Sequence, residues 1–370
     1  MRSRSIFSVI IILLCCTCVD RISFDVGTTS TFPIVIEGYI SDQPGPYQIN
    51  ISKAFDIESK QSLKSPISVK RLVITDNLGN SETLTETVAG TYQTRAGGIR
   101  GVIGRSYKLN AELLDGRVYQ SLPDTLLASG TVDDVYFNFK TDKDQEGATT
   151  YGFDVLFNST AGEKSNFHFL WQFVGTFQVD TNPELHKVTC GESKCPRPRT
   201  CSGYVVNNSG ELEQARFCEC CTCWSNVFND SPIVSDNQLV EGGRFKGVEA
   251  AYVPVNQWTF MYKVHAEVRQ MSLSPRAFAF WKAIKAQKQA VTSLFQPVTG
   301  KVPTNFIQVS GTAGPIEGLF YATAIAKKSV FITRNDVPSE SMIPVQDLPF
   351  EDSCLSLFPN STTTEPDFWQ

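Results

Sequence analysis

Cysteine is the residue whose number and spacing in this chain most clearly suggest chemistry. The chain has 370 residues and 11 cysteines, and four of these lie within the six-residue segment CECCTC at positions 218–223. Thiolates so close together can bind a soft metal ion such as zinc. A zinc ribbon uses pairs of cysteines two residues apart, whereas Cys190, Cys195 and Cys201 have four and five residues between them. The spacing therefore favours disulfides over a metal site.

Whether these cysteines form disulfides or bind a metal ion depends on the compartment of the protein. Residues 1–17 predict an export signal. Two arginines precede an apolar run at positions 6–14, which ends in small residues and cysteines. Such a run is too short to span a membrane as a helix. The mature protein is therefore expected outside the cytoplasm.

A cluster of cysteines at the end of such a signal resembles the lipobox of bacterial lipoproteins. Cys18 is our candidate for the lipid, because the small Thr17 precedes it. Cys15 and Cys16 are alternatives, since each has an aliphatic residue three positions earlier, and a plain secretory signal is a further alternative. Residues 18–31 then form a polar tether between the lipid and the folded body.

Export makes disulfides the expected state of the remaining cysteines, because oxidising compartments preserve them. Three cysteines belong to the signal, which leaves an even set of eight: Cys190, Cys195, Cys201, Cys218, Cys220, Cys221, Cys223 and Cys354. Spacing does not reveal the pairing. Cys354 is the natural candidate to join the C-terminal segment to the insertion at 190–223. We expect disulfides here, and neither a metal ion nor a cofactor.

Motifs of known catalytic sites do not occur in the sequence. There are three histidines, His168, His186 and His265, and neither a nucleophile elbow, a zinc-protease motif nor a phosphate-binding loop. The formal net charge of -5 comes without a basic run, which argues against nucleic acid as a partner. The sequence therefore favours a binding or structural protein over an enzyme.

Short strands are predicted throughout residues 32–127. Apolar and polar residues alternate at 47–51 and 107–113, and turns rich in Gly, Asn and Asp, such as those at 76–80 and 115–116, separate such runs. Strands of this length at regular spacing, without a helical period, are typical of an immunoglobulin-like β-sandwich.

Residues 128–370 predict a second, β-rich domain. Bulky aromatic residues alternate between Phe167 and Phe177, which places them on one side of a long strand. A helix is predicted over 274–295, because Ser274 can cap it, Pro275 suits its first turn, and apolar residues including Trp281 recur on one face. We therefore expect a mainly β chain with one long helix and a Cys-rich insertion at 190–223.

The Cys-rich insertion is the candidate binding surface. Trp224 follows the cysteines directly, and Tyr204 and Phe217 lie nearby in the sequence. Disulfides could hold these rings in place for contact with a ligand or partner. The alternative is a surface excursion that the disulfides merely staple.

Several segments, in their order, carry a family resemblance. They are CVD at 18–20, FPIVIEGYISDQPGPYQINIS at 32–52, CCTCW at 220–224, FWKAIKAQ at 280–287 and GLFYATA at 318–324. In these segments the chain resembles a family of uncharacterised outer-membrane lipoproteins of Bacteroidetes. That family has a domain of unknown function and is frequently encoded beside TonB-dependent receptors.

The resemblance implies a lipid-anchored protein at the outer membrane, facing the cell surface or the periplasm. Its implied role is that of a binding or accessory subunit with a TonB-dependent receptor in nutrient capture or uptake. The family brings no catalytic residues with it. A structural subunit of an envelope complex and a secreted hydrolase are the alternative functions.

Overall fold

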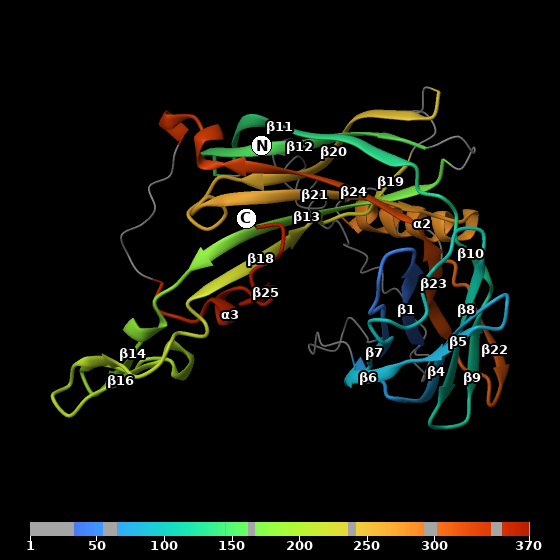
Figure 1. Ribbon diagram of the computed structural model, residues 1–370, viewed down its shortest axis with the longest axis horizontal. Coiled ribbons are helices and arrows are strands. Elements are labelled where there is room, and N and C mark those ends of the chain that lie inside the picture. Colours follow the sequence, from blue (N-terminus) through green and yellow to red (C-terminus); the bar gives the residue numbers. More distant parts are fainter. Residues whose placement is uncertain are drawn as a thin grey trace, which may run out of the picture. The chain divides into compact units, whose positions relative to one another are not determined.

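The computed structural model describes residues 33–54, 65–144, 146–161, 167–235, 242–291, 302–341 and 350–369. They belong to one compact unit. The predicted mainly β class with one long helix is confirmed in this part of the chain, which consists of several sheets and helix α2 (Figure 1). The predicted signal at 1–17, the tether at 18–31 and the candidate lipid site Cys18 lie outside the described residues.

Two sheets enclose one hydrophobic core and form a first sandwich. One sheet has the order β23-β1-β2-β7-β6 with β3 beside β2, and the other has the order β22-β9-β8-β4-β5 with β10 beside β8. The strands are β1 (Ile34–Ser41), β2 (Gln48–Lys53), β3 (Ser65–Pro66), β4 (Val69–Asp76), β5 (Ser81–Thr83), β6 (Thr85–Val88), β7 (Thr91–Gln93), β8 (Ser106–Leu113), β9 (Val118–Ser121), β10 (Asp124–Thr125), β22 (Phe306–Ser310) and β23 (Ile316–Thr323). Buried residues alternate strictly along β8, as a strand with one face in the core requires.

The first sandwich is completed by residues far along the chain. β23 pairs with β1 in parallel, from Ile34 opposite Ile316 to Ser41 opposite Thr323, and β22 pairs with β9 antiparallel. The domain boundaries predicted from the sequence assign residues 306–323 to the second domain, 128–370. In the structure, strands β22 and β23 from this segment belong to the first sandwich. Alternation identifies a segment as a strand, but it does not identify the sheet that the strand joins.

Gly318 lies where β23 meets β1. Its φ of +99° is unfavourable for side chains, and a Cβ there would lie 2.1 Å from the carbonyl oxygen of Ile36. We expect Gly318→Ala to lower the free energy of unfolding by about 1 to 3 kcal/mol in urea denaturation. Gly79→Ala is the control, because Gly79 has a similar φ of +89° but open space around it. Equal losses in both variants would contradict a role for the close strand approach.

Glu82 is a buried carboxylate that organises a loop of the first sandwich. It is 5% exposed and accepts hydrogen bonds from the backbone N–H groups of Arg95, at 2.8 Å, and Ile99. Burial alone would raise its pKa, but these hydrogen bonds and the Arg95 guanidinium outweigh burial and lower the pKa.

A carboxyl whose pKa is lowered by folding stabilises the protein above its unfolded pKa, near about 4, and this contribution is lost as the pH falls through the folded pKa. We expect Glu82→Gln to cost about 1 to 3 kcal/mol at neutral pH and less in acid, as measured by urea unfolding across pH. Glu112→Gln is the control, because its ion pair with Lys70 is largely exposed. A loss in Glu82→Gln that is the same at all pH values would refute the linkage.

A second sandwich has its own core. Its sheets have the orders β11-β12-β20 and β24-β21-β13-β18-β25, with β19 beside β13. The strands are β11 (Thr131–Lys143), β12 (Thr149–Thr160), β13 (Phe169–Asp180), β18 (Thr222–Phe228), β19 (Ile233–Val234), β20 (Arg244–Pro254), β21 (Lys263–Ser272), β24 (Ile325–Thr333) and β25 (Ser361–Thr362). As predicted, Phe169, Trp171, Phe173 and Phe177 of β13 are buried in this core.

Helix α2 (Pro275–Val291) begins where the sequence predicts. The backbone N–H of Ala277 donates to the Ser274 side chain at 3.2 Å, which caps the first turn. Its apolar face belongs to a third cluster that also contains Leu170 of β13 and Leu319 of β23, so the helix bridges the two sandwiches. Its predicted continuation to residue 295 lies outside the described residues.

The remaining helices are short: α3 (Cys354–Leu357) and the 3-10 turns Pro183–Leu185, Thr200–Ser202, Arg334–Asp336 and Ser339–Ser341. Among the residues described here, none of the helices is both long and apolar enough to cross a membrane.

The Cys-rich insertion contains two small hairpins. They are formed by β14 (Lys187–Cys190) with β15 (Ser193–Pro196) and by β16 (Tyr204–Val206) with β17 (Leu212–Gln214). The structure pairs all eight cysteines, as Cys190–Cys195, Cys201–Cys220, Cys218–Cys221 and Cys223–Cys354. Three bridges are internal to the insertion, and the fourth links strand β18 to helix α3.

Candidate functional site

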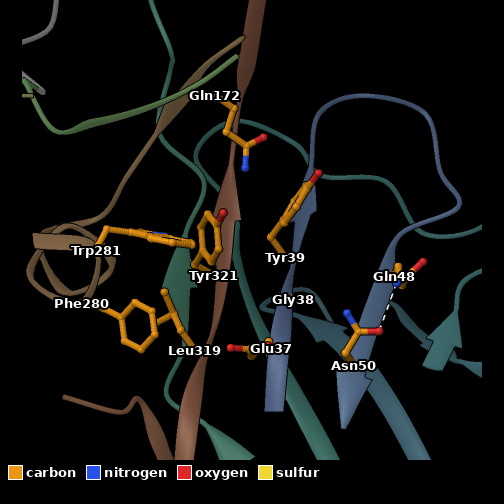
Figure 2. Close-up of a pocket in the computed structure, with 10 residues that line it drawn as sticks. All are labelled: Glu37, Gly38, Tyr39, Gln48, Asn50, Gln172, Phe280, Trp281, Leu319 and Tyr321. Carbon is orange, nitrogen blue, oxygen red and sulfur yellow. Dashed lines mark hydrogen bonds between the residues drawn. The ribbon is translucent and has the colours of Figure 1, made fainter. Parts of the chain in front are cut away.

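A cavity of about 330 Å³ lies between helix α2, strand β13 and the outer face of the sheet that contains β1, β2 and β23 (Figure 2). Its volume is at the lower end of the range of small-molecule sites. It is lined by a mixture of aromatic, apolar, carboxamide and acidic residues: Glu37, Gly38, Tyr39, Gln48, Asn50, Gln172, Phe280, Trp281, Leu319 and Tyr321.

Strand alternation positions these side chains. On β1, Ile36 and Ile40 are buried in the first core, so Glu37 and Tyr39 face the opposite side. β23 repeats this pattern, because Phe320 lies in the core while Tyr321 lines the cavity. The same period of two that builds the sandwich therefore builds the floor of the cavity.

Three aromatic rings from three elements form one wall. The ring centroids of Tyr39 and Tyr321 are 5.5 Å apart, and those of Trp281 and Tyr321 are 6.4 Å apart (Figure 2). Burial raises the pKa of Tyr321, and the neighbouring indole of Trp281 offsets part of this rise. The wall is therefore neutral at physiological pH and combines apolar faces with polar ring atoms.

Polar groups on this wall are incompletely satisfied within the described chain. The indole Nε1 of Trp281 is buried beside Tyr321 and has no partner at full hydrogen-bonding geometry. The Tyr39 hydroxyl and the Gln172 carboxamide line the same space, and Figure 2 shows Gln172 directed toward the two tyrosines. Because buried polar groups are nearly always hydrogen-bonded in folded proteins, an unpaired donor in a cavity indicates a water molecule or a ligand as its partner.

Two further cavities continue the first at either end. One of about 290 Å³ shares Gln172 and Trp281 with it, and one of about 390 Å³ shares Tyr39 and Gln48. We call the three together the junction groove. Its shape suits an extended ligand better than a compact one.

Basic side chains lie at both ends of the groove. Arg269 and Lys327 line the larger end cavity, and both approach Glu267, with N···O distances of 2.6 Å and 3.9 Å. At the other end, the Lys288 ammonium donates to the backbone carbonyl of Asp230. The groove thus has basic side chains at its ends and the acidic Glu37 in its central cavity.

The backbone hydrogen-bonding groups of the strands beneath the groove already have partners. β1 pairs with β2 on one side and with β23 on the other. On the outer edge of β23, the Asn305 carboxamide donates to the Phe320 carbonyl at 2.6 Å and accepts from its N–H at 3.1 Å. A carboxylate oxygen of Asp124 accepts from the Ala322 N–H at 2.9 Å. Side chains are therefore the groups that this site offers to a ligand.

The aromatic residues proposed from the insertion do not line the groove, and Trp224 is not exposed beside the other two. Phe217 is 89% exposed, and Tyr204 is partly exposed at the start of β16. Trp224 is a correction to the sequence interpretation: it is 7% exposed within β18, and its ring lies 6.5 Å from that of Trp369. Proximity to the cysteines in sequence did not reveal that Trp224 points into the protein.

None of the three histidines lines a cavity of the groove. The His168 ring stacks on Phe278 at 4.3 Å, and the His265 ring stacks on Phe368 at 4.0 Å. Burial lowers the pKa of both. His186 contacts a backbone carbonyl at 3.2 Å. These contacts are those of packing residues.

Sequence reasoning missed the groove because the lining of its central cavity alone comes from five separate elements, β1, β2, β13, β23 and α2. Trp281 was predicted as a packing residue on the helix, and it does contact the apolar cluster beside α2. It also lines two of the three cavities. The available signal was the outward face of β1 and β23, where tyrosines occur at positions that a solvated strand usually gives to polar residues.

Comparison with known families identifies the relationship of the chain. A family model described as a domain of unknown function (DUF4249) matches residues 19–329. Because this match covers most of the chain, the chain belongs to that family. No curated protein and no solved structure matches it.

Proposed function

We propose that this chain is a lipid-anchored binding protein of the outer membrane that captures a nutrient for a TonB-dependent receptor. The observation that carries the proposal is the junction groove, where the Tyr39 hydroxyl, the Gln172 carboxamide and the buried Trp281 indole N–H converge on one cavity. A preformed concave site with convergent polar groups is the usual form of a ligand site.

The membrane anchor and the receptor are supported by the sequence. The short apolar run ends in cysteines, and Cys18 is the proposed lipid site. A lipid confines the protein to the membrane plane, so that even a weak contact with a membrane receptor benefits from a high effective concentration. The receptor itself is proposed from the family resemblance.

Affinity purification from solubilised outer membranes tests this function. The tagged full-length chain should partition into the detergent phase, and its purification should recover a TonB-dependent receptor. Cys18→Ala should remain in the aqueous phase and recover no receptor. Cys15→Ala and Cys16→Ala are matched controls that should behave as wild type. Intact-mass measurement should place the acyl chains on Cys18. Purification without any receptor, together with hydrolase activity in the purified protein, would favour the secreted hydrolase.

The exposed side chains of the insertion favour a second candidate, a structural subunit of an envelope complex. Phe217, Val205 and Val206 are 89%, 48% and 41% exposed on a segment held by disulfides. Exposed apolar side chains on a rigid segment are typical of contacts with other proteins. Loss of the receptor in Phe217→Ser, with ligand binding intact, would assign the contact to this surface.

A further inference from the structure

We infer that the ligand of the junction groove is a neutral oligosaccharide bound in an extended conformation. This inference rests on the proposed function and names the class of ligand for the same site. It follows from the faces, the hydrogen-bonding groups, the charge and the shape of the groove.

The aromatic wall suits sugar rings. A pyranose presents C–H groups on its faces and hydroxyls around its edge, so it needs a flat apolar surface beside polar groups. Tyr39 and Trp281, which pack against the buried Tyr321, supply both, because one ring carries a hydroxyl and the other an indole N–H at its edge. A purely apolar ligand would leave the buried indole N–H without a partner at full hydrogen-bonding geometry.

The carboxamides match hydroxyl groups, which donate and accept at once. A carboxamide also has both a donor and an acceptor. Gln172 makes no hydrogen bond through its side chain within the described chain. Asn50 accepts through Oδ1 from Gln48 and Thr91, which leaves its NH₂ group available to a ligand. Sugar hydroxyls can satisfy each of these groups.

The charge pattern argues against an ionic ligand. Glu37 lines the central cavity and already has an interaction of its own. Glu267 approaches both Arg269 and Lys327 at one end, and its single negative charge balances only one of these two cations. An anionic chain would lie beside Glu37, and a cationic chain would lie beside the basic residues at either end. A neutral chain avoids both costs.

The backbone of the site argues against a peptide bound as an added strand. That binding mode needs an unpaired strand edge. The strands beneath the groove are paired, and the outer edge of β23 is covered by Asn305 and Asp124. Recognition by side chains along three linked cavities is instead suited to a chain of several sugar units.

The test uses hexasaccharides of α-glucan, β-glucan, xylan, mannan and chitin as probes, with an oligogalacturonide and a tryptic digest of casein as the anionic and peptide comparators. Binding is measured by calorimetry on the full chain. We expect at least one neutral hexasaccharide to bind, and to bind about tenfold more tightly than its disaccharide, because the longer chain occupies adjoining cavities.

Substitutions in the groove test whether the hexasaccharide binds there. Tyr39→Ala and Gln172→Ala should each weaken binding about tenfold or more, and Trp281→Phe, which keeps an aromatic ring, should weaken it by removing the indole N–H. Arg71→Ala is the matched control, since Arg71 is exposed and lines a different depression of about 330 Å³ on the other sheet of the first sandwich. Thermal unfolding confirms that each variant is folded.

The outcomes separate this inference from the proposed function. Binding of casein peptides that is lost in the groove variants would overturn the sugar assignment and retain the groove as a ligand site. Failure of every neutral hexasaccharide to bind, or binding that the groove variants leave unchanged, would overturn the inference. Recovery of the receptor from membranes decides independently whether the proposed function stands.

Discussion

Replacement of Trp171 by alanine should lower the free energy of unfolding by about 3 to 5 kcal/mol, because it opens a cavity in the core of the second sandwich. Trp171 is 2% exposed, and its ring centroid lies 4.9 Å from that of Phe245 and 5.3 Å from that of Phe157. The surrounding side chains come from paired strands that cannot easily move inward to fill the space.

Trp171 also completes a buried polar network. Its indole N–H donates to Oε1 of Gln270 at 2.7 Å, and the Gln270 amide donates to the backbone carbonyls of Ser129 and Thr160. Gln270 is fully buried. Without the indole, its Oε1 loses that hydrogen bond inside the protein, which adds to the cost of the cavity.

Urea denaturation of three variants separates these contributions. Trp171→Phe retains much of the ring but removes the N–H, so it should cost about 1 to 3 kcal/mol. Gln172→Ala is the neighbouring control on the groove side of β13, and it should change stability by about 0.5 kcal/mol or less. A loss below about 1 kcal/mol in Trp171→Ala would mean that the core relaxes around the cavity.

The contrast between Trp171 and Gln172 shows what alternation can predict. The aromatic residues between Phe167 and Phe177 identified the buried face of β13 from sequence, and they form the second core. The opposite face of the same strand contributes Gln172 to the groove. Alternation thus located both faces, but only the three-dimensional arrangement showed that one faces the groove.

Signals from neighbouring residues predicted local structure such as the start of a helix. Nothing in the sequence predicted which distant strands pair. Ser274 and Pro275 marked the start of α2 because capping involves atoms a few residues apart. The pairing of β23 with β1 joins residues that are far apart in the chain, and neither strand carries a local signal for the other. Since the groove requires both strands and the helix, its position could not be predicted from the sequence.

Removal of the bridge between Cys223 and Cys354 should lower the free energy of unfolding by about 4 to 5 kcal/mol, which is the other large effect expected here. These cysteines are 131 residues apart in the chain. A disulfide restricts the unfolded chain more strongly when it closes a longer loop, so this bridge should contribute the most of the four.

Two non-covalent contacts lie beside this bridge. The backbone N–H of Cys354 donates to the carbonyl of Cys220 at 3.2 Å, and Arg199 pairs with Asp352 at 2.9 Å. Both contacts join the base of the insertion to the C-terminal segment. Because the ion pair is partly exposed, it should contribute much less than the covalent link.

The matched control has the same chemistry and a short loop. Cys190 and Cys195 are 5 residues apart, so the double variant Cys190→Ser/Cys195→Ser should cost about 2 kcal/mol, compared with about 4 to 5 for Cys223→Ser/Cys354→Ser. Denaturation under oxidising conditions gives both values, and thiol titration of the unfolded, unreduced chain from residue 19 onward should detect no free thiol. Equal costs for the two bridges would show that native-state contacts, and not loop closure, determine their contribution. Stoichiometric zinc with titratable thiols would instead restore the metal alternative for the CECCTC segment.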